Sequence, residues 1–507
     1  MKTESAVLLS YPELEYRAGL SRKREPVISS HFLDAISQDQ NLQLYTTESL
    51  TARAYRITPE VVDEVLLPVL RDASRNFASQ RAAAALSRAR TRSKEYGLAE
   101  PALVTAAEAI TELMFDRQFS RKANLTRSRI TVRNEIARRL DRKLGIDLVI
   151  PALPFKILCP FKARGIMPDF AEVNMVLFFY EIAYAIELVA AMASPDAAPV
   201  AARFVVVSDG KRFASIVNVS NETVDRYHLG VVAWIRRLGV EKHVVVTDYW
   251  ELLHERLPKQ VLAEKRRVAR DAKRLYLEKL NPAFDVLNMP RSLAVSRTLE
   301  PDPEENNLEG RFASLFKSLV YTMNYRALDK LELTDTEKQH LYRKITSKLL
   351  RPFESPEAIS GSTLTNEDLR QEMLKEVWQA TVEYMAEIKS DRDLDEDPVL
   401  VCMPNAVRWT IHPKKGQFAI MIPSVSGFFI QAWAGSGLFR RTKRGAIQLC
   451  SYPVLGIEGF ESVPVFEEVD ENSREQPIFY VDRQCEFKDM ESFAVELKRC
   501  ITRRRVF

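Results

Sequence analysis

RFVVVSDGKRF at residues 203–213 and KHVVVTDYW at residues 242–250 are short runs of β-branched residues separated by a segment long enough for a helix. A third run, DLVIP at 147–151, precedes them. Such runs, joined by helix-length segments, are typical of parallel strands with crossover helices. The sequence therefore predicts an α/β core with a Rossmann-like, mostly parallel sheet flanked by helices. In such sheets, ligands bind at the loops that follow the carboxyl ends of the strands.

The loop after the first predicted strand, LPFKILCPFKARGIMPDFAE at 153–172, is rich in charge. Lys156 and Lys162 lie six residues apart, and Asp169 follows a proline as at a helix start. Glu172 would lie one turn further along the same side of that helix. Two ammonium groups and two carboxylates are therefore expected near one helix N-terminus. The alternative is a surface ion-pair network that merely caps the helix.

The second predicted strand ends in Ser208, Asp209 and Gly210, with Lys211 next. Glycine permits a tight turn that exposes backbone N–H groups beside the lysine, which suits an anion or a sugar hydroxyl. Ser-Asp-Gly is also an ordinary turn. Asp248 ends the third predicted strand in the same way.

Far downstream, RWTIHPKKGQFAIMI at 408–422 has the alternation of a β-hairpin with its turn at residues 413–416. Arg408, Thr410 and His412 would share one face of the first strand. A guanidinium suits a phosphate or carboxylate, and a neutral imidazole suits proton transfer near pH 7. The alternative is an ordinary exposed strand face.

Taken in order, these blocks resemble the pyoverdine/dityrosine biosynthesis family, which includes the isocyanide (isonitrile) synthases. The resemblance covers roughly residues 130–460. The matching positions are Lys156-x5-Lys162-x2-Gly165-x2-Pro168-Asp169-x-Ala171-Glu172, then Ser208-Asp209-Gly210-Lys211-x-Phe213, then Val219, Val224 and Tyr227, and finally Arg408-Trp409-Thr410-Ile411-His412-Pro413.

The resemblance implies an enzyme that converts the amino group of an L-amino acid, typically tyrosine or tryptophan, into an isonitrile. The added carbon would come from C2 of ribulose 5-phosphate, which is a co-substrate, and neither a metal nor an organic cofactor is implied. The residues expected to be catalytic are His412, Asp169, Glu172 and Asp209. Those expected to bind the substrates are Lys156, Lys162, Ser208, Lys211, Tyr227, Arg408 and Trp433. A partner iron/2-oxoglutarate oxygenase that modifies the product would fit the family.

Two departures from the family pattern leave the product open. The family commonly has an aspartate shortly after its Ser-Asp-Gly block, where this chain has Ala214 and Ser215. It also commonly has a Thr-Pro-Trp-His run, where residues 431–434 of this chain read QAWA. Trp433 is kept, but the histidine is absent. If that histidine takes part in isonitrile formation, the alternative product is an N-formyl amino acid, as in the dityrosine branch.

Composition sets outer limits on function. With 46% hydrophobic and 28% charged residues, the 507-residue chain is that of an ordinary globular protein. A net charge of +4, from 73 basic and 69 acidic side chains, argues against a dedicated nucleic-acid binder. Five scattered cysteines without a CxxC pair and six dispersed histidines predict a cytoplasmic protein with reduced thiols and no metal site. The most apolar segment, 173–193, carries Glu181 and Glu187, so we expect a buried helix and no membrane association.

The chain is expected to divide into four parts: 1–144, a mostly helical N-terminal extension; 145–295, the α/β core with catalytic loops; 296–400, a linker and helical segment; and 401–507, a strand-rich part that contributes to the active site. Arginines are frequent in the helices before residue 144, and 259–280 is a basic amphipathic helix. A non-enzymatic protein that binds nucleic acid or a partner through these helices is the third hypothesis. Because acids alternate with the arginines, a solvated helical face is preferred. His228, a lone histidine, is expected to be a packed or surface residue.

Overall fold

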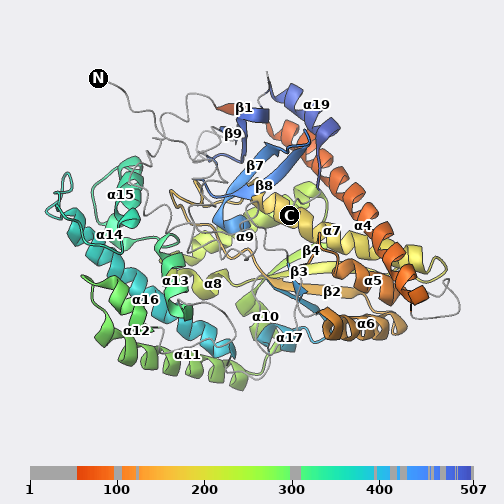
Figure 1. The fold of residues 1–507 in the computed structure, drawn as a ribbon, viewed down its shortest axis with the longest axis horizontal. Helices are drawn as coiled ribbons and strands as arrows, with labels where there is room; N and C mark the ends of the chain where they lie inside the picture. The colour runs from red at the N-terminus through yellow and green to blue at the C-terminus, as the bar shows by residue number, and fades with distance from the viewer. Residues whose placement is uncertain are drawn as a thin grey trace.

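The computed structural model describes residues 54–95, 105–120, 125–296, 310–392, 397–410, 420–422, 431–454, 457, 462–468, 476–485, 487 and 489–503. Within these residues the strands form two five-stranded sheets, surrounded by helices (Figure 1). The predicted α/β class is confirmed.

The first sheet has the order β4-β3-β2-β5-β6, and all of its pairs are parallel. Its strands are β2 (Ile146–Pro151), β3 (Ala202–Ser208), β4 (Val244–Asp248), β5 (Val407–Thr410) and β6 (Ile420–Met421). The three strands predicted first are confirmed as β2, β3 and β4. From β2 the chain builds outward through β3 to β4, and it returns to the other side of β2 only at β5. The carboxyl ends of β2 and β5 therefore meet where the strand order changes direction, which is where open α/β sheets bind ligands.

The predicted hairpin at 408–422 is wrong. β5 and β6 are parallel, with Trp409 beside Ile420 and Thr410 beside Met421. The expected turn and His412 lie in 411–419, outside the described residues. Alternation of side chains is the same in parallel and antiparallel strands, so it predicted the strands but not their direction. The strand face is not exposed either, because all four residues of β5 are buried.

Helices cover both faces of this sheet. On one face α7 (Phe170–Ala193) packs with Leu148, Ile150 and Phe204, and on the other face α10 (Tyr249–Arg256) and α17 (Pro398–Cys402) cover the alternate residues of β2 and β3. Of the described helices, α7 alone is long and apolar enough to cross a membrane, yet 72% of its most apolar window is buried in the protein. It is the central core helix, as expected from its two glutamates.

The second sheet is mixed, with the order β1-β9-β10-β7-β8. Its strands are β1 (Tyr55–Ile57), β7 (Ser436–Arg441), β8 (Ile447–Tyr452), β9 (Val463–Glu467) and β10 (Phe479–Val481). It joins the N-terminal part of the described chain to the C-terminal part through the parallel pair β1 and β9. The aromatic ring of Phe170, at the start of α7, packs on Phe439 and Phe479 of this sheet. Helix α7 thus lies between the two sheets (Figure 1).

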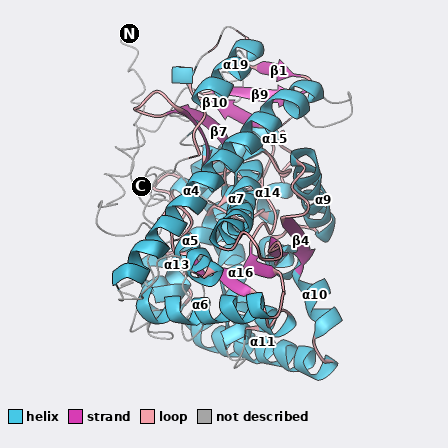
Figure 2. Cartoon of the chain, turned by 90° about the vertical axis from the view of Figure 1, so that its right-hand side faces the viewer, coloured by secondary structure: helices cyan, strands magenta, loops and turns pink. Residues whose placement is uncertain are grey.

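The remaining elements surround these layers. The N-terminal helices are η1 (Val61–Leu66), α4 (Leu67–Glu95), α5 (Ala106–Met114) and α6 (Leu125–Asp141), of which α4 and α5 pack on α7 (Figure 2). η1 and α4 form one continuous helical stretch. The other helices are α8 (Gly210–Phe213), η3 (Ala214–Val217), α9 (Asn221–Leu238), α11 (Lys259–Leu280), η4 (Asn281–Ala283), α12 (Met289–Ser296), α13 (Gly310–Val320), α14 (Arg326–Asp329), α15 (Asp335–Ser347), α16 (Asn366–Arg392), η5 (Ala432–Ala434), η6 (Arg483–Cys485) and α19 (Met490–Cys500).

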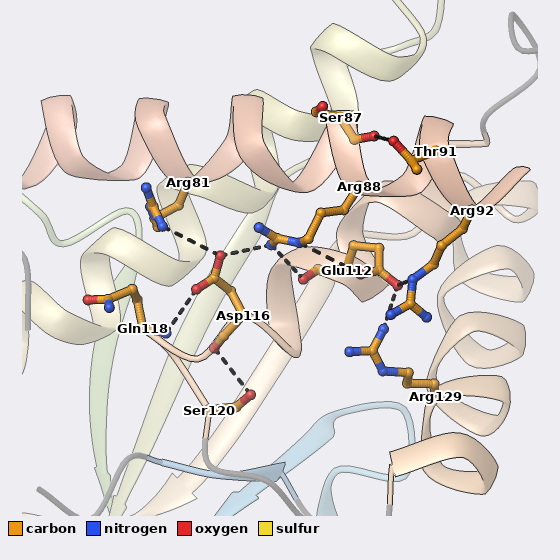
Figure 3. A network of polar contacts seen from close by, with 10 residues as sticks. All are labelled: Arg81, Ser87, Arg88, Thr91, Arg92, Glu112, Asp116, Gln118, Ser120 and Arg129. Atoms are coloured by element: carbon orange, nitrogen blue, oxygen red, sulfur yellow. Dashed lines mark hydrogen bonds and ion pairs between the residues drawn. The ribbon is translucent and has the colours of Figure 1, made fainter. Parts of the chain in front are cut away.

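Many of the N-terminal arginines are used inside the protein. Asp116, just beyond α5, accepts from Arg88 at 2.8 Å, and Glu112 of α5 pairs with Arg92 and Arg129 at 3.2 and 2.5 Å (Figure 3). Both acids are buried. The arginines of α4 and α6 therefore tie these two helices to α5.

Candidate active site

A buried cluster of charge lies where the loop after β2 enters α7. Lys156 Nζ is 3.0 Å from Asp169 Oδ2 and 2.7 Å from Glu172 Oε2. Each of the three side chains is at most 4% exposed. Tyr227, from α9, donates its hydroxyl to Glu172 Oε1 at 2.9 Å. Four residues predicted for the site are thus in direct contact, and the surface ion-pair alternative does not fit their burial.

Local sequence explains how the two acids are held. Asp169 is the N-cap of α7, with Oδ1 accepting from the Ala171 N–H at 2.7 Å, while Glu172 Oε2 accepts from the Asp169 N–H at 2.8 Å. This is a reciprocal capping box. Gly437 of β7 adds a third donor, its N–H lying 3.1 Å from Asp169 Oδ1. Through Gly437, the second sheet therefore helps to hold the Asp169 carboxylate, which lies near the carboxyl end of β2 in the first sheet.

The cluster has acid–base character near neutral pH. Burial raises the pKa of Glu172 to about 7, in spite of the Lys156 ammonium beside it. Burial and the Glu172 charge raise the pKa of Tyr227 well above its ordinary value, so the phenol stays a donor. A carboxyl group with a pKa close to the working pH is suited to both giving and taking a proton.

A second group of polar residues lies at the ends of β3 and β4. Ser208 and Asp248 are register partners on these strands. Ser208 Oγ donates to the Leu153 carbonyl at 2.9 Å and is in direct contact with His228 Nε2. Burial lowers the pKa of His228, which keeps the imidazole neutral near pH 7. The contact between His228 and Ser208 could not be predicted from the sequence. A single histidine on a helix belongs to no motif, and only the fold brings it beside Ser208.

Asp248 extends this second group. Its Oδ1 caps α10 by accepting from the N–H groups of Trp250 and Glu251. Its Oδ2 is buried and has no hydrogen-bond partner among the described residues. Its charge partly offsets the effect of burial, which lowers the pKa of His228. It also adds to the effect of the Asp225 hydrogen bond, which raises the pKa of Lys211.

The loops carrying the two groups fit tightly together. A Cβ atom on Gly210 would lie 2.2 Å from the Pro154 carbonyl oxygen and 2.8 Å from Val224 Cγ1. Glycine is therefore needed here for close approach, with φ in an ordinary region. Leu153, by contrast, has φ of +55°, a strained conformation for a leucine, which directs its carbonyl at Ser208.

The remaining predicted residues are placed as follows. Lys211 pairs with Asp225 at 2.8 Å, and Asp209 is partly buried. Burial raises the pKa of the Tyr384 phenol, and the charge of Asp209 adds to that shift. Trp433, in η5, is partly buried against the main core. His412 lies outside the described residues.

Arg408 does not join the Lys156 cluster. Its register partner on β2 is Val149, which faces α10 and α17, whereas the Lys156 cluster lies at the start of α7 on the opposite face. The guanidinium is buried and pairs with Asp397, the N-cap of α17, at 2.9 Å. Anion binding by Arg408 stays a prediction.

Lys162 has quite different neighbours. Its Nζ donates to Thr322 Oγ1 at 2.8 Å, and no carboxylate contacts it among the described residues. Burial lowers the pKa of this lysine.

Comparisons identify a protein family, a curated relative and a solved structure that are similar to this chain. The profile of a family described as pyoverdine/dityrosine biosynthesis protein matches residues 136–444, more than half of the chain. An L-tyrosine isonitrile synthase from Xenorhabdus nematophila is 27% identical over 125 residues, covering 22% of this chain and 35% of that protein. The match thus spans about a third of the length of that curated relative. The crystal structure of the PvcA protein from Pseudomonas aeruginosa aligns with a TM-score of 0.43 and 17% identity, covering 74% of this chain and 99% of that one.

Proposed function

Because this chain belongs to the pyoverdine/dityrosine biosynthesis family, we propose that it is an isonitrile synthase of secondary metabolism. The enzyme converts the amino group of an L-amino acid, tyrosine- or tryptophan-like, into an isonitrile, with ribulose 5-phosphate as the one-carbon donor. The reaction takes place in the cytoplasm without metal or organic cofactor.

One observation carries this proposal beyond family membership: the buried Lys156–Asp169–Glu172–Tyr227 cluster beside the carboxyl end of β2. Joining an amine to a ketone requires a base to deprotonate the incoming ammonium and an acid to protonate the departing oxygen. Glu172, with a pKa of about 7, is suited to both tasks. Lys156 and Asp169 hold it in place.

The other residues are assigned roles from the chemistry of their side chains. We assign Asp209 and Ser208 to hydrogen bonds with sugar hydroxyls, and we assign Lys211, which pairs with Asp225, to positive charge at the end of β3. We assign His412 and His228 to proton transfer, and Trp433 to the side of an aromatic substrate.

The proposal is tested by incubating the purified protein with ribulose 5-phosphate and a panel of L-amino acids, with mass spectrometry of the products. An isonitrile product gains one carbon atom and loses two hydrogen atoms. A gain of the elements of carbon monoxide instead identifies an N-formylating enzyme, which the missing histidine at 431–434 favours as the second candidate. Absence of turnover with every amino acid, with intact folding, contradicts both. Salt-sensitive binding of nucleic acid in that case supports the non-enzymatic hypothesis.

A further inference from the structure

Lys162 differs from the other three cations expected to bind substrate. Lys156, Lys211 and Arg408 each contact a carboxylate at 3.0 Å or less. In the part of the chain that the structure describes, the Lys162 ammonium has a hydroxyl, that of Thr322, as its side-chain partner. Lys162 is partly buried, and an ammonium that loses part of its hydration without a counter-charge is destabilised. A lysine in an ion pair is explained by the stability that the pair contributes. Lys162 has no such pair among the described residues, so its position calls for another explanation.

Among the described residues, the side chains that interact with Lys162 are neutral. Thr322 Oγ1 donates its hydrogen to the Ser318 carbonyl at 2.7 Å, so it accepts the hydrogen bond from Lys162 through a lone pair. Burial raises the pKa of the nearby Cys159 thiol, and it raises that of the Tyr342 phenol well above its ordinary range. Neither group is an anion at neutral pH. These surroundings favour the uncharged amine of Lys162, which is the nucleophilic form.

The backbone under Lys162 is held from two sides. Cys159 and Ala163 form a β-bridge that closes a tight turn, and the Lys162 carbonyl accepts from the Val454 N–H at 3.1 Å. On the other side the ring of Phe161 packs edge-on against Tyr321, with the centroids 5.1 Å apart. The amine is therefore presented from a fixed turn, which reduces the entropy lost on reaction.

We propose that Lys162 is the nucleophile that first captures the ketone of the sugar phosphate as an imine; this rests on the proposed function. Lys162 Nζ attacks the ketone carbon, forming a C–N bond while the carbonyl π electrons move to oxygen. The oxygen then leaves as water with the two amine hydrogens, and a C=N bond remains. The amine of the amino acid adds to the same carbon, the bond to Lys162 breaks, and the lysine recovers its two hydrogens from that amine. The substrate imine is formed and the enzyme amine is regenerated.

This division of labour fits the two lysines of the loop. Lys156 is held between two buried carboxylates, and its pKa is raised, so it stays charged and unreactive. Lys162 lies six residues further along the loop. It contacts no carboxylate among the described residues, and its pKa is lowered. A protonated imine is more electrophilic than the ketone from which it forms, so capture by Lys162 prepares the carbon for the second amine.

Reductive trapping tests the proposal. The full-length protein is incubated with ribulose 5-phosphate and sodium cyanoborohydride, without amino acid, and digested for peptide mass spectrometry. We expect a reduced pentulose phosphate adduct on Lys162, absent from K162M. K273R, which alters a partly exposed lysine paired with Glu383, is the control and should retain the adduct. K162M should also lose at least about tenfold in turnover while remaining as stable as the wild type, because it replaces a partly buried amine that has no ion pair among the described residues with an apolar side chain of similar length.

Two results overturn the proposal: no adduct on Lys162 in the wild-type protein, or wild-type turnover by folded K162M. Product formation, measured separately in the amino-acid panel, decides the proposed function. An active enzyme without the adduct refutes the role of Lys162 alone, whereas an adduct without any amino-acid product supports carbonyl capture and refutes the isonitrile reaction.

Discussion

Lys156 Nζ lies 2.7 Å from Glu172 Oε2, with both side chains almost completely buried. The lysine is the counter-charge that allows Glu172 and Asp169 to remain together at the start of α7. The contact therefore contributes both to the stability of the protein and to its proposed chemistry. Different substitutions at these residues measure the two contributions separately.

K156M should lower the free energy of unfolding by about 3–5 kcal/mol, because it leaves two buried carboxylates without their cation. The double variant K156M/E172Q should recover part of that loss, since it removes one of the uncompensated charges. Urea denaturation followed by circular dichroism measures both. K273M, at a partly exposed pair, is the matched control and should change stability by about 1 kcal/mol at most. Equal stability of K156M and K273M would show that the buried pair is not a stabilising contact.

Glu172 should make the protein less stable as the pH rises. Its pKa in the folded protein is about 7, above the ordinary value of 4.5, so the folded state holds this proton more tightly than the unfolded state. The resulting stabilisation is complete below pH 4.5 and is lost as the pH passes through 7. Relative to E172Q, the wild type should therefore lose up to about 3 kcal/mol between about pH 5 and pH 8. Parallel stability curves for the two proteins would contradict this.

H228Q should reduce turnover by about tenfold or more and alter the acidic limb of the pH–rate profile, because burial keeps this imidazole neutral and Ser208 fixes its position. H254Q, on the exposed side of α10, is the control. The measurement is initial rate against pH at saturating substrates. An H228Q profile that overlays that of H254Q would assign His228 a packing role, as first expected from the sequence.

H412A should lower turnover by about tenfold or more without loss of stability, if this histidine transfers protons as the family motif implies. Comparison of H412A with H228Q and with the double variant distinguishes one shared proton path from two independent ones. Less-than-additive losses in the double variant indicate a shared path. Full activity of folded H412A would remove it from the site.

G210A should be strongly destabilising, because its Cβ would overlap the Pro154 carbonyl, which is backbone and cannot move aside cheaply. We expect a loss of about 2 kcal/mol or more in unfolding free energy. G361N is a suitable control: Gly361 has φ of +71° with no atom within 4 Å of the added Cβ, and asparagine tolerates that backbone region. Thermal unfolding compares the two variants. A G210A protein as stable as G361N would show that the two loops are not in contact.

Much of the first sheet could be predicted from the sequence. The β-branched runs ending at Pro151, Ser208 and Asp248 are local signals, and the Pro168–Asp169 helix start is equally local. β6 could not be oriented, because its partner and direction depend on contacts with β5. β1 could not be predicted, because three residues gain their strand pairing only from β9, more than 400 positions away.

By itself the sequence determined which residue types follow each strand, since strand, turn and cap signals act over a few neighbouring residues. Only the tertiary structure decided what each charge is for. Lys156 and Lys162 stand six positions apart in one loop, but the fold buries the first between two carboxylates and leaves the second with a threonine hydroxyl. Those partners come from α7 and from the segment after α13, and the electrostatic environment of a side chain is set by what surrounds it in space.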